Sequence, residues 1–161
     1  EKIIGSISEW DVTENQYFAL AIADPAHKKK ISEKLLNKGA KFTSIVHPSA
    51  IISDTSKIGE GSIIYWGTTL GPDCNIGRFC TIMSTIGHDS VIGDYTTICS
   101  NCSTNGHFTA GTQCYIGSNV ACHPGITLGD NVKVGMGSIV LKSIKSGKFV
   151  FGNPAQQVEL S

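Results

Sequence analysis

The chain has 161 residues, enough for one domain with a real core, or for one domain plus a fragment. Lys and Arg together number 13, as do Asp and Glu, so the formal net charge is +0 and no basic surface for nucleic acid is indicated. Only 16% of residues are charged, against about 25% in an average domain, and 18 are Gly. This composition favours a stacked or oligomeric architecture.

Targeting signals are not evident in the composition or at the start of the chain. No apolar run approaches the roughly 18 residues that a membrane-spanning helix needs. No secretory signal leads the chain, so we expect a cytoplasmic protein without a membrane span, whose six Cys are reduced thiols.

The first elements in the chain are predicted to be a strand, a helix and a second strand. "YFALAIAD" (17–24) is typical of a buried strand, and residues 25–39 begin with Pro and end with Gly, as helices often do. "FTSIVHP" (42–48) predicts a strand that leads into the next region. We therefore expect residues 1–47 to be the trailing part of a parallel α/β, Rossmann-like substrate-binding domain. The Gly-rich phosphate loop of such a domain would lie before these residues.

Residues 48–144 carry a six-residue repeat of aliphatic anchors. The first series is Ile58, Ile64, Leu70, Ile76 and Ile82. The second series is Ile86, Ile92, Ile98, Thr104, Ala110, Ile116, Cys122, Leu128, Val134 and Val140. Strands that recur every six residues with Gly, Asp or Asn between them predict a parallel β-helix. Three such repeats would form one triangular coil of about 18 residues.

The repeat also gives an interpretation of the cysteines. The residue four places after an anchor is usually small, and Cys occupies this place at Cys74, Cys80, Cys102 and Cys114. Cys122 stands at an anchor. We expect these thiols to be buried packing groups, because a free Cys behaves as a small hydrophobe.

The two anchor series are out of phase, which draws attention to the residues that follow. Ile82 and Ile86 are four residues apart instead of six, so a loop or a tightened corner is expected between them. His88 comes just after this break, and Gly106 lies 18 residues later, one coil further on. Because adjacent strands in a sheet are about 4.8 Å apart, Gly106 should stack on His88.

This pair suggests a catalytic arrangement. His88 can act as a general base near neutral pH, and Asp89 or Asp94 could orient its ring. The backbone N–H of Gly106 could stabilise a developing oxyanion. Such a site suits attack of a nucleophile on a thioester, with CoA as the acyl carrier and no metal required.

The repeat region resembles the left-handed β-helix acyltransferases. Residues 84–140, "STIGHDSVIGDY…GMGSIV", and the segment before them are similar to the sialic acid O-acetyltransferases and the nucleotide-4-amino-sugar N-acetyltransferases. The resemblance implies a left-handed coil and a homotrimer that binds acetyl-CoA between neighbouring β-helices. It also implies that His88 with Asp89 is the base and that Gly106 provides the main-chain donor.

The resemblance further suggests which residues bind acetyl-CoA. A second family His, nine residues after the base, contacts acetyl-CoA, and Thr97 stands at that place here. Backbone groups at Gly117, Ser118, Gly135 and Met136, stacked on the last coils, are further candidates.

The C-terminal segment 145–161 leaves the repeat and is expected to close the β-helix. "GNPAQQ" (152–157) resembles the family's closing segment, with Gln156 where a basic residue is expected. Lys142, Lys145 and Lys148 could meet CoA phosphates or be solvated.

Two other classes of protein share this architecture. The γ-type carbonic anhydrases hold zinc with three His between subunits, and His88, His107 and His123 could form such a set. However, those enzymes carry an early Arg–Asp pair, and the only Arg here, Arg78, is followed by Phe79 and Cys80. A non-catalytic trimeric scaffold is the remaining alternative.

The sequence therefore predicts an acetyl-CoA-dependent acetyltransferase. Its expected acceptor is the amino group, or a hydroxyl, of a sugar, with a nucleotide-linked 4-amino sugar for bacterial surface glycans preferred over sialic acid. No metal is expected.

Overall fold

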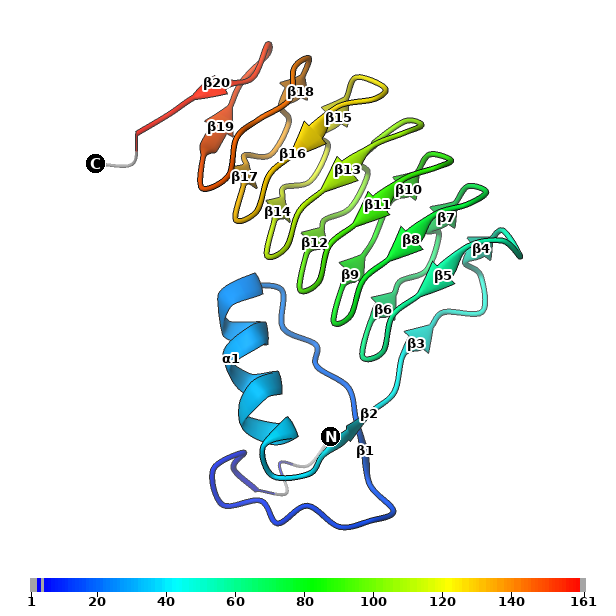
Figure 1. Cartoon of the computed structure of the whole chain (residues 1–161), viewed down its shortest axis with the longest axis vertical. Coiled ribbons are helices and arrows are strands. Elements are labelled where there is room, and N and C mark those ends of the chain that lie inside the picture. The colour runs from blue at the N-terminus through cyan, green and yellow to red at the C-terminus, as the bar shows by residue number, and fades with distance from the viewer. Residues whose placement is uncertain (1–2, 4, 160–161) are drawn as a thin grey trace.

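The computed structural model of the chain, which describes residue 3 and residues 5–159, is a parallel β-solenoid preceded by one helix (Figure 1). The chain winds through three faces, most coils contribute one short strand to each face, and the coils stack on one another from β3 to β19. The predicted parallel β-helix is thus confirmed.

The three faces are built from strands of two or three residues. The long face contains β3 (Ile45–Val46), β6 (Ile63–Ile64), β9 (Thr81–Ile82), β12 (Thr97–Ile98), β14 (Tyr115–Ile116), β17 (Lys133–Val134), β19 (Phe149–Phe151) and the antiparallel β20 (Gln156–Gln157). The five-stranded face contains β5 (Lys57–Ile58), β8 (Asn75–Ile76), β11 (Val91–Ile92), β13 (Thr109–Ala110) and β16 (Thr127–Leu128). The interrupted face contains β4 (Ile51–Ile52), β7 (Thr69–Leu70), β10 (Thr85–Ile86), β15 (Ala121–Cys122) and β18 (Ile139–Val140). Isolated bridges through Ser103 join β10 to β15.

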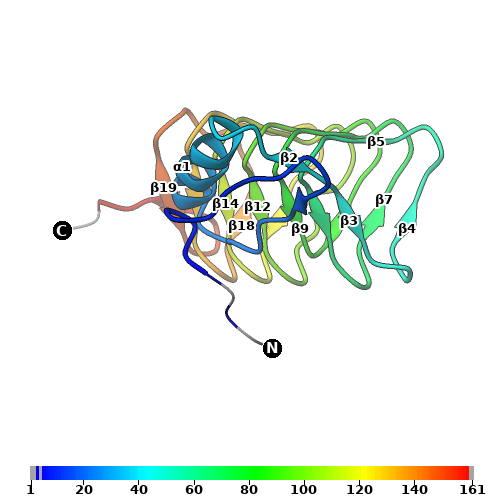
Figure 2. The ribbon, with the colours of Figure 1, turned by 90° about the horizontal axis from the view of Figure 1, so that it is seen from below.

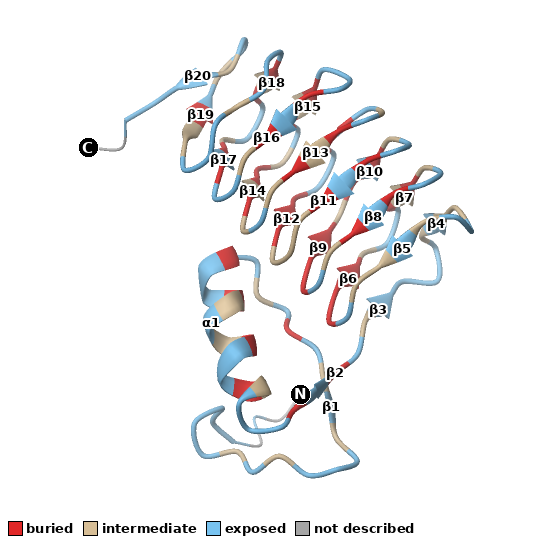
Figure 3. Ribbon diagram, in the orientation of Figure 1, coloured by how far each residue is buried: buried red, intermediate tan, exposed pale blue. Residues whose placement is uncertain are grey.

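The aliphatic anchors form the core because the parallel register places each anchor on the one in the coil below. On the long face, Ile82 pairs with Ile98, which in turn pairs with Ile116. All three side chains are at most 1% exposed, and Figure 3 shows the same alternation of buried and exposed residues in coil after coil. The six Cys are free and buried, as the sequence predicts. These thiols therefore act as core residues.

The break in the repeat is a tightened corner. Only Met83 and Ser84 separate β9 from β10, whereas four residues separate β6 from β7. The Ser84 side chain is buried: its hydroxyl donates to the carbonyl of Cys99 and accepts from the Cys102 N–H at 2.8 Å. A buried hydroxyl thus supplies the hydrogen bonds that connect this shortened corner to the next coil.

The strands before the solenoid are shorter than predicted. The strand expected over 17–24 is only β1 (Tyr17–Phe18), which pairs in parallel with β2 (Lys41–Phe42). The second predicted strand, 42–48, is in fact divided between β2 and β3, and β3 already belongs to the solenoid. At the other end, β19 pairs in parallel with β17, so the ladder continues past residue 144.

The predicted helix is α1 (Pro25–Leu36), which lies against the long face (Figure 2). The Asp24 side chain caps it by accepting from the His27 N–H, and the φ of +83° at Gly39 suits only a Gly. Buried residues of α1 face the solenoid (Figure 3).

Three aromatic rings pack together next to α1. The ring of Phe42 meets the ring of Phe79 edge to face, with the centroids 4.8 Å apart, and the ring of Phe79 stacks on that of Tyr95, with the centroids 5.3 Å apart. Within the described ranges 3 and 5–159, no helix is both long and apolar enough to cross a membrane.

The side chain of Lys28 connects α1 to the solenoid through a buried ammonium group. It is 1% exposed, and its Nζ donates to Thr81 Oγ1 and to Thr97 Oγ1, both at 2.9 Å. Burial lowers the pKa of Lys28 from 10.5 to about 8. The protein therefore holds a buried cation against two neutral hydroxyls, which is unfavourable for the charged form.

This burial predicts a pH-dependent difference in stability between the wild type and Lys28→Met. Below pH 8, Lys28 is protonated in both the folded and the unfolded state, and the cost of burying the charge lowers the stability of the wild type. Above pH 8, the folded state releases this proton while the unfolded chain keeps it up to about pH 10.5, so the wild type gains stability as the pH rises. We expect the stability of Lys28→Met relative to the wild type to decrease by about 1 kcal/mol between pH 8 and pH 9. Urea unfolding of both proteins at each pH measures this, and a difference that does not change with pH would contradict it.

Candidate functional site

The corner between the interrupted face and the five-stranded face, here called the His88 corner, consists of residues 72–73, 88–89, 106–107 and 124–125. Backbone hydrogen bonds connect its coils: Asp89 N donates to Pro72 O at 2.9 Å and His107 N donates to His88 O at 2.8 Å. Asp89 and His107 have φ of 55° and 56°, in the left-handed region. This ladder fixes the backbone from which His88, Asp89 and His107 project.

His88 and Asp89 form a hydrogen-bonded pair. Nδ1 of His88 lies 2.6 Å from Oδ2 of Asp89. Because an ionised carboxylate can only accept, Nδ1 carries the proton and Nε2 keeps its lone pair. This hydrogen bond holds the pKa of Asp89 below its usual value, and the nearby His107 acts in the same direction. His88 is therefore held in the tautomer that a general base requires, with Nε2 available.

His107 is a third polar group at this corner. Its Nδ1 lies 4.0 Å from Asp89 Oδ2, and its ring meets that of His88 edge to face, with the ring centroids 5.0 Å apart. The His88 and His107 side chains are 55% and 66% exposed, so both are open to a ligand. From the sequence we interpret His107 as a corner residue near the acyl site, and the structure places its ring beside His88 and Asp89.

Gly106 lies directly against the His88 ring. A Cβ built on Gly106 would be 2.5 Å from His88 Nε2, closer than real Cβ contacts come. Only Gly at this position leaves room for the imidazole ring of His88. Gly106 therefore stacks on His88, as the 18-residue spacing predicts.

The N–H of Gly106 makes no hydrogen bond within the part of the chain that the structure describes. At the neighbouring corner, the equivalent N–H groups of Arg78 and Thr112 donate to Oδ1 of Asp94 and of Asp130, one coil later, at 2.8 and 2.7 Å. The residue one coil after Gly106 is Pro124, which has no side-chain acceptor. The N–H of Gly106 is therefore available to donate to a ligand or to water.

The residues around Gly106 depart from the regular ladder. Thr104, the one frankly polar anchor, has a fully buried side chain whose Oγ1 is without a hydrogen-bond partner among the described residues. The neighbouring Asn105 donates through its side-chain Nδ2 to Cys122 O at 2.7 Å. This irregular coil shapes the backbone that presents Gly106.

Asp94, the alternative partner of His88, lies elsewhere. Its carboxylate accepts from the Arg78 N–H at the corner between the five-stranded face and the long face. Of the two carboxylates that the sequence suggested, only Asp89 contacts His88, because Asp94 is a coil-to-coil cap.

Four of the five residues suggested for acetyl-CoA line one hollow of about 360 Å³. These are Gly117, Ser118, Gly135 and Met136, and the hollow extends along the long face to the start of α1. Its other lining residues are Asp24, Tyr115, Lys133, Val134 and Phe149. The sequence had not indicated these five: Asp24 precedes the first residue of α1, and the other four lie on β14, β17 and β19.

The fifth residue, Thr97, is not in this hollow. Its side chain is fully buried beneath α1, where Oγ1 donates to the carbonyl of Ala23 at 2.7 Å and accepts from Lys28. A direct contact between this side chain and acetyl-CoA is therefore not possible in this conformation, because α1 covers it.

The hollow and the His88 corner lie on different parts of the same chain. The hollow follows the long face, whereas the His88 corner joins the other two faces and so lies opposite the long face across the triangular coil. One copy of the chain thus presents two separate surfaces.

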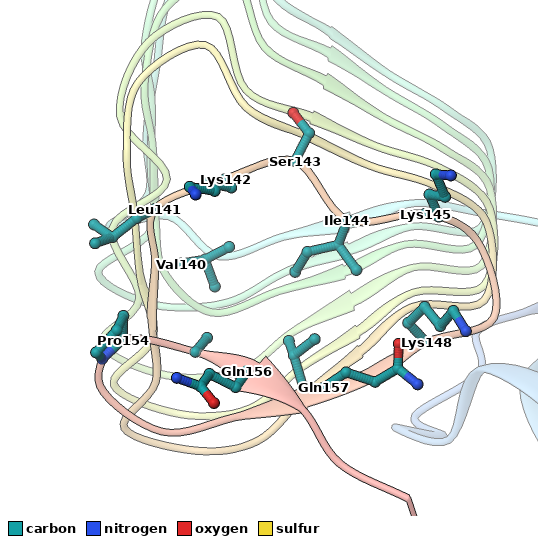
Figure 4. Close-up of a pocket in the computed structure, with 12 residues that line it drawn as sticks. Val140, Leu141, Lys142, Ser143, Ile144, Lys145, Lys148, Pro154, Gln156 and Gln157 are labelled. Atoms are coloured by element: carbon teal, nitrogen blue, oxygen red, sulfur yellow. The ribbon is translucent and has the colours of Figure 1, made fainter.

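The open end of the last coil forms another cavity, of about 440 Å³. Figure 4 shows Val140 and Ile144 pointing into the space that the coil encloses, with Lys142, Lys145 and Lys148 around its rim. Gln156 also lines this end. None of the three Lys belongs to the hollow that contains Gly117 and Met136.

The three His of the carbonic anhydrase alternative do not come together. The candidate metal ligands that cluster within 4.8 Å are His88, Asp89 and His107. His123 instead contacts the carbonyl of Pro124 through Nδ1 at 2.9 Å.

Comparison with known proteins gives consistent results. Residues 110–142 match the hexapeptide repeat of succinyl-transferase. The chain is 35% identical over 153 residues to GDP-perosamine N-acetyltransferase of Escherichia coli O157:H7, covering 91% of the chain and 69% of that relative. PerB from Caulobacter crescentus, solved in complex with CoA and GDP-perosamine, superposes with a TM-score of 0.86 at 25% identity, covering 89% of this chain and 70% of PerB. WeeI from Acinetobacter baumannii AYE superposes with a TM-score of 0.87 at 29% identity, covering 94% of this chain and 74% of WeeI.

The sequence identity, the shared solenoid and the matched repeat all indicate one family. The chain is an acyltransferase that belongs to the hexapeptide-repeat sugar acyltransferases, the family that includes GDP-perosamine N-acetyltransferase.

Proposed function

We propose that this protein transfers the acetyl group of acetyl-CoA to the amino group of a nucleotide-linked amino sugar, with His88 as the general base. The observation that carries the proposal is the His88 corner, where a base, its orienting carboxylate and an unpaired N–H donor meet. The similarity to GDP-perosamine N-acetyltransferase makes GDP-perosamine the first acceptor to test.

In the proposed reaction, the lone pair of the sugar nitrogen attacks the thioester carbonyl carbon. Nε2 of His88 takes the proton from that nitrogen, and Asp89 stabilises the resulting imidazolium. The carbonyl oxygen becomes an oxyanion that accepts from the Gly106 N–H. The oxyanion then re-forms the carbonyl as the C–S bond breaks, and the leaving CoA sulfur takes the proton from His88 Nε2, which returns the base to its starting state, so atoms and charges balance.

We expect Asp89→Asn to lower kcat by about tenfold or more, because an amide does not hold Nδ1 of His88 protonated as a carboxylate does. Asp73→Asn is the matched control, since Asp73 has a similar positive φ one coil earlier and its side chain makes no hydrogen bond or ion pair with His88. Initial rates at saturating acetyl-CoA measure both variants. Equal rates for Asp89→Asn and the wild type would remove Asp89 from the mechanism.

The proposal includes a trimer with active sites between subunits. Acetyl-CoA would occupy the hollow on the long face of one copy, lined by Gly117, Ser118, Gly135 and Met136, and meet the His88 corner of a neighbouring copy. The separation of these two surfaces within one chain supports this arrangement. Met136 and Trp66, which are 68% and 72% exposed, are apolar side chains that such an assembly would cover.

The proposal also covers the handedness of the coil and the division of the chain into domains. We assign the coil the left-handed sense of that family and treat residues 1–47 as the trailing part of an α/β domain that binds the nucleotide sugar. The order β1, α1, β2, with parallel pairing of the two strands, supports this assignment. Residues 48–144 would then be the catalytic β-helix and residues 145–161 its closing segment.

Release of the CoA thiol tests the proposal. The purified chain is incubated with acetyl-CoA and a panel that contains GDP-perosamine, other nucleotide-linked amino sugars, the same sugars without the nucleotide, and sialic acid. We expect turnover with a nucleotide-linked amino sugar and little with sialic acid. Turnover with sialic acid alone would identify an O-acetyltransferase instead, and binding of CoA without any turnover would favour a non-catalytic role.

A further inference from the structure

Lys28 is buried in a way that stability alone does not favour. Its charged end has two hydroxyl partners, and no carboxylate forms a salt bridge with it among the described residues. Replacing a poorly compensated buried charge with an apolar side chain is often neutral or stabilising. Stability alone therefore does not account for the buried contacts of Lys28.

The two hydroxyls that Lys28 binds are not equivalent. Thr97 Oγ1 also donates to the carbonyl of Ala23 at 2.7 Å, whereas Thr81 Oγ1 makes no further hydrogen bond with the residues that the structure describes. Ala23 immediately precedes Asp24, which caps α1 and lines the hollow that contains Gly117 and Met136. A continuous set of hydrogen bonds thus runs from Lys28 through Thr97 to the chain segment beside the hollow.

A second lining residue of the hollow, Tyr115, is also next to Thr97. Tyr115, which lines the hollow, is the direct strand neighbour of Thr97. Thr97 therefore contacts both the segment that begins α1, through Ala23 and Lys28, and the strand β14, through its pairing with Tyr115.

We propose that Thr97 and Lys28 are positioning residues for acetyl-CoA, which fix the Ala23–Asp24 segment against the solenoid and so complete the hollow. The inference rests on the proposed binding of acetyl-CoA there. Thr97 acts without touching the donor, through the backbone of Ala23. The position that the family resemblance associates with a donor-contacting His thus acts indirectly in this chain.

A matched pair of variants tests this inference. Thr97→Val and Thr81→Val each remove one acceptor of Lys28 and preserve the side-chain shape, but only Thr97→Val breaks the bond to Ala23. We expect Thr97→Val to raise the Kd for CoA and the KM for acetyl-CoA by about tenfold, the scale of one hydrogen bond lost. Thr81→Val should change both by less than about twofold. Neither variant should alter kcat at saturation or the KM for the acceptor, and Thr97→Ser, which keeps the hydroxyl, should restore CoA binding.

The outcomes separate this inference from the proposed function. If the wild type does not bind CoA by isothermal titration, the proposed function itself fails. If the wild type binds CoA, equal Kd values for Thr97→Val and Thr81→Val would overturn the positioning role. Hydrogen exchange on the wild type gives a second test that needs no variant: CoA should slow exchange of the amides of residues 23–28, and unchanged exchange there would also overturn it.

Discussion

Replacing His88 with Ala is expected to lower kcat by at least about a hundredfold, the scale of a lost general base. The Kd for CoA should remain within about twofold, because His88 does not line the hollow with Gly117 and Met136. His88 is suited to this role because its Nδ1 is held by Asp89 and its Nε2 faces Gly106. The loss should therefore appear in the chemical step.

The control for this variant is His47→Ala. His47 is an exposed His in the first coil, and its Nδ1 contacts the side chain and the N–H of Ser49. Initial rates of thiol release from saturating acetyl-CoA measure both proteins. If His88→Ala turns over as fast as His47→Ala, His88 is a solvated corner residue and not the general base.

Replacing Gly106 with Ala is expected to lower kcat by about a hundredfold, nearly as much as replacing His88. This is the scale associated with losing a preorganised catalytic group. The added Cβ would meet His88 Nε2 and Cε1 at 2.5 and 2.6 Å, so the ring must move away from its place between Asp89 and the substrate. Gly106 does not have a positive φ, so Ala can adopt its backbone conformation, and the effect should come from the displaced ring.

A double-mutant cycle separates a displaced ring from a general loss of structure. In the His88→Ala background the ring is gone, and adding Gly106→Ala should reduce the residual rate by less than about twofold. Fully additive losses in the double variant would show that Gly106→Ala acts independently of His88. Thermal unfolding of all four proteins checks that the fold is retained.

The repeat made much of this fold predictable from the sequence. A β-helix has a fixed number of residues per coil, so counting 18 positions from His88 leads directly to Gly106, as the structure bears out. The same counting identified the anchors as core residues: all except Ile58 and Thr104 belong to the buried apolar core, Ile58 packs against it, and Thr104 is buried as well. The four-residue step between Ile82 and Ile86 likewise indicated the tightened corner at Met83 and Ser84.

Features that depend on contacts across faces were not predictable in this way. The burial of Thr97 follows from the docking of α1, which no repeat specifies. The suggestion of Asp94 as a partner of His88 failed because position in the repeat places it at a different corner. That the N–H of Gly106 has no acceptor among the described residues could have been found in the sequence, since Pro124 stands where the equivalent positions of the neighbouring corner carry Asp94 and Asp130.

The measurement that tests the central claim most directly is the identity of the product formed from acetyl-CoA and GDP-perosamine. Wild type and His88→Ala are incubated side by side, and the products are analysed by mass spectrometry and NMR. The account predicts a singly acetylated nucleotide sugar with the acetyl group on nitrogen, formed by the wild type and reduced at least about a hundredfold with His88→Ala. Acetylation on oxygen, or equal N-acetylation by the two proteins, would contradict it.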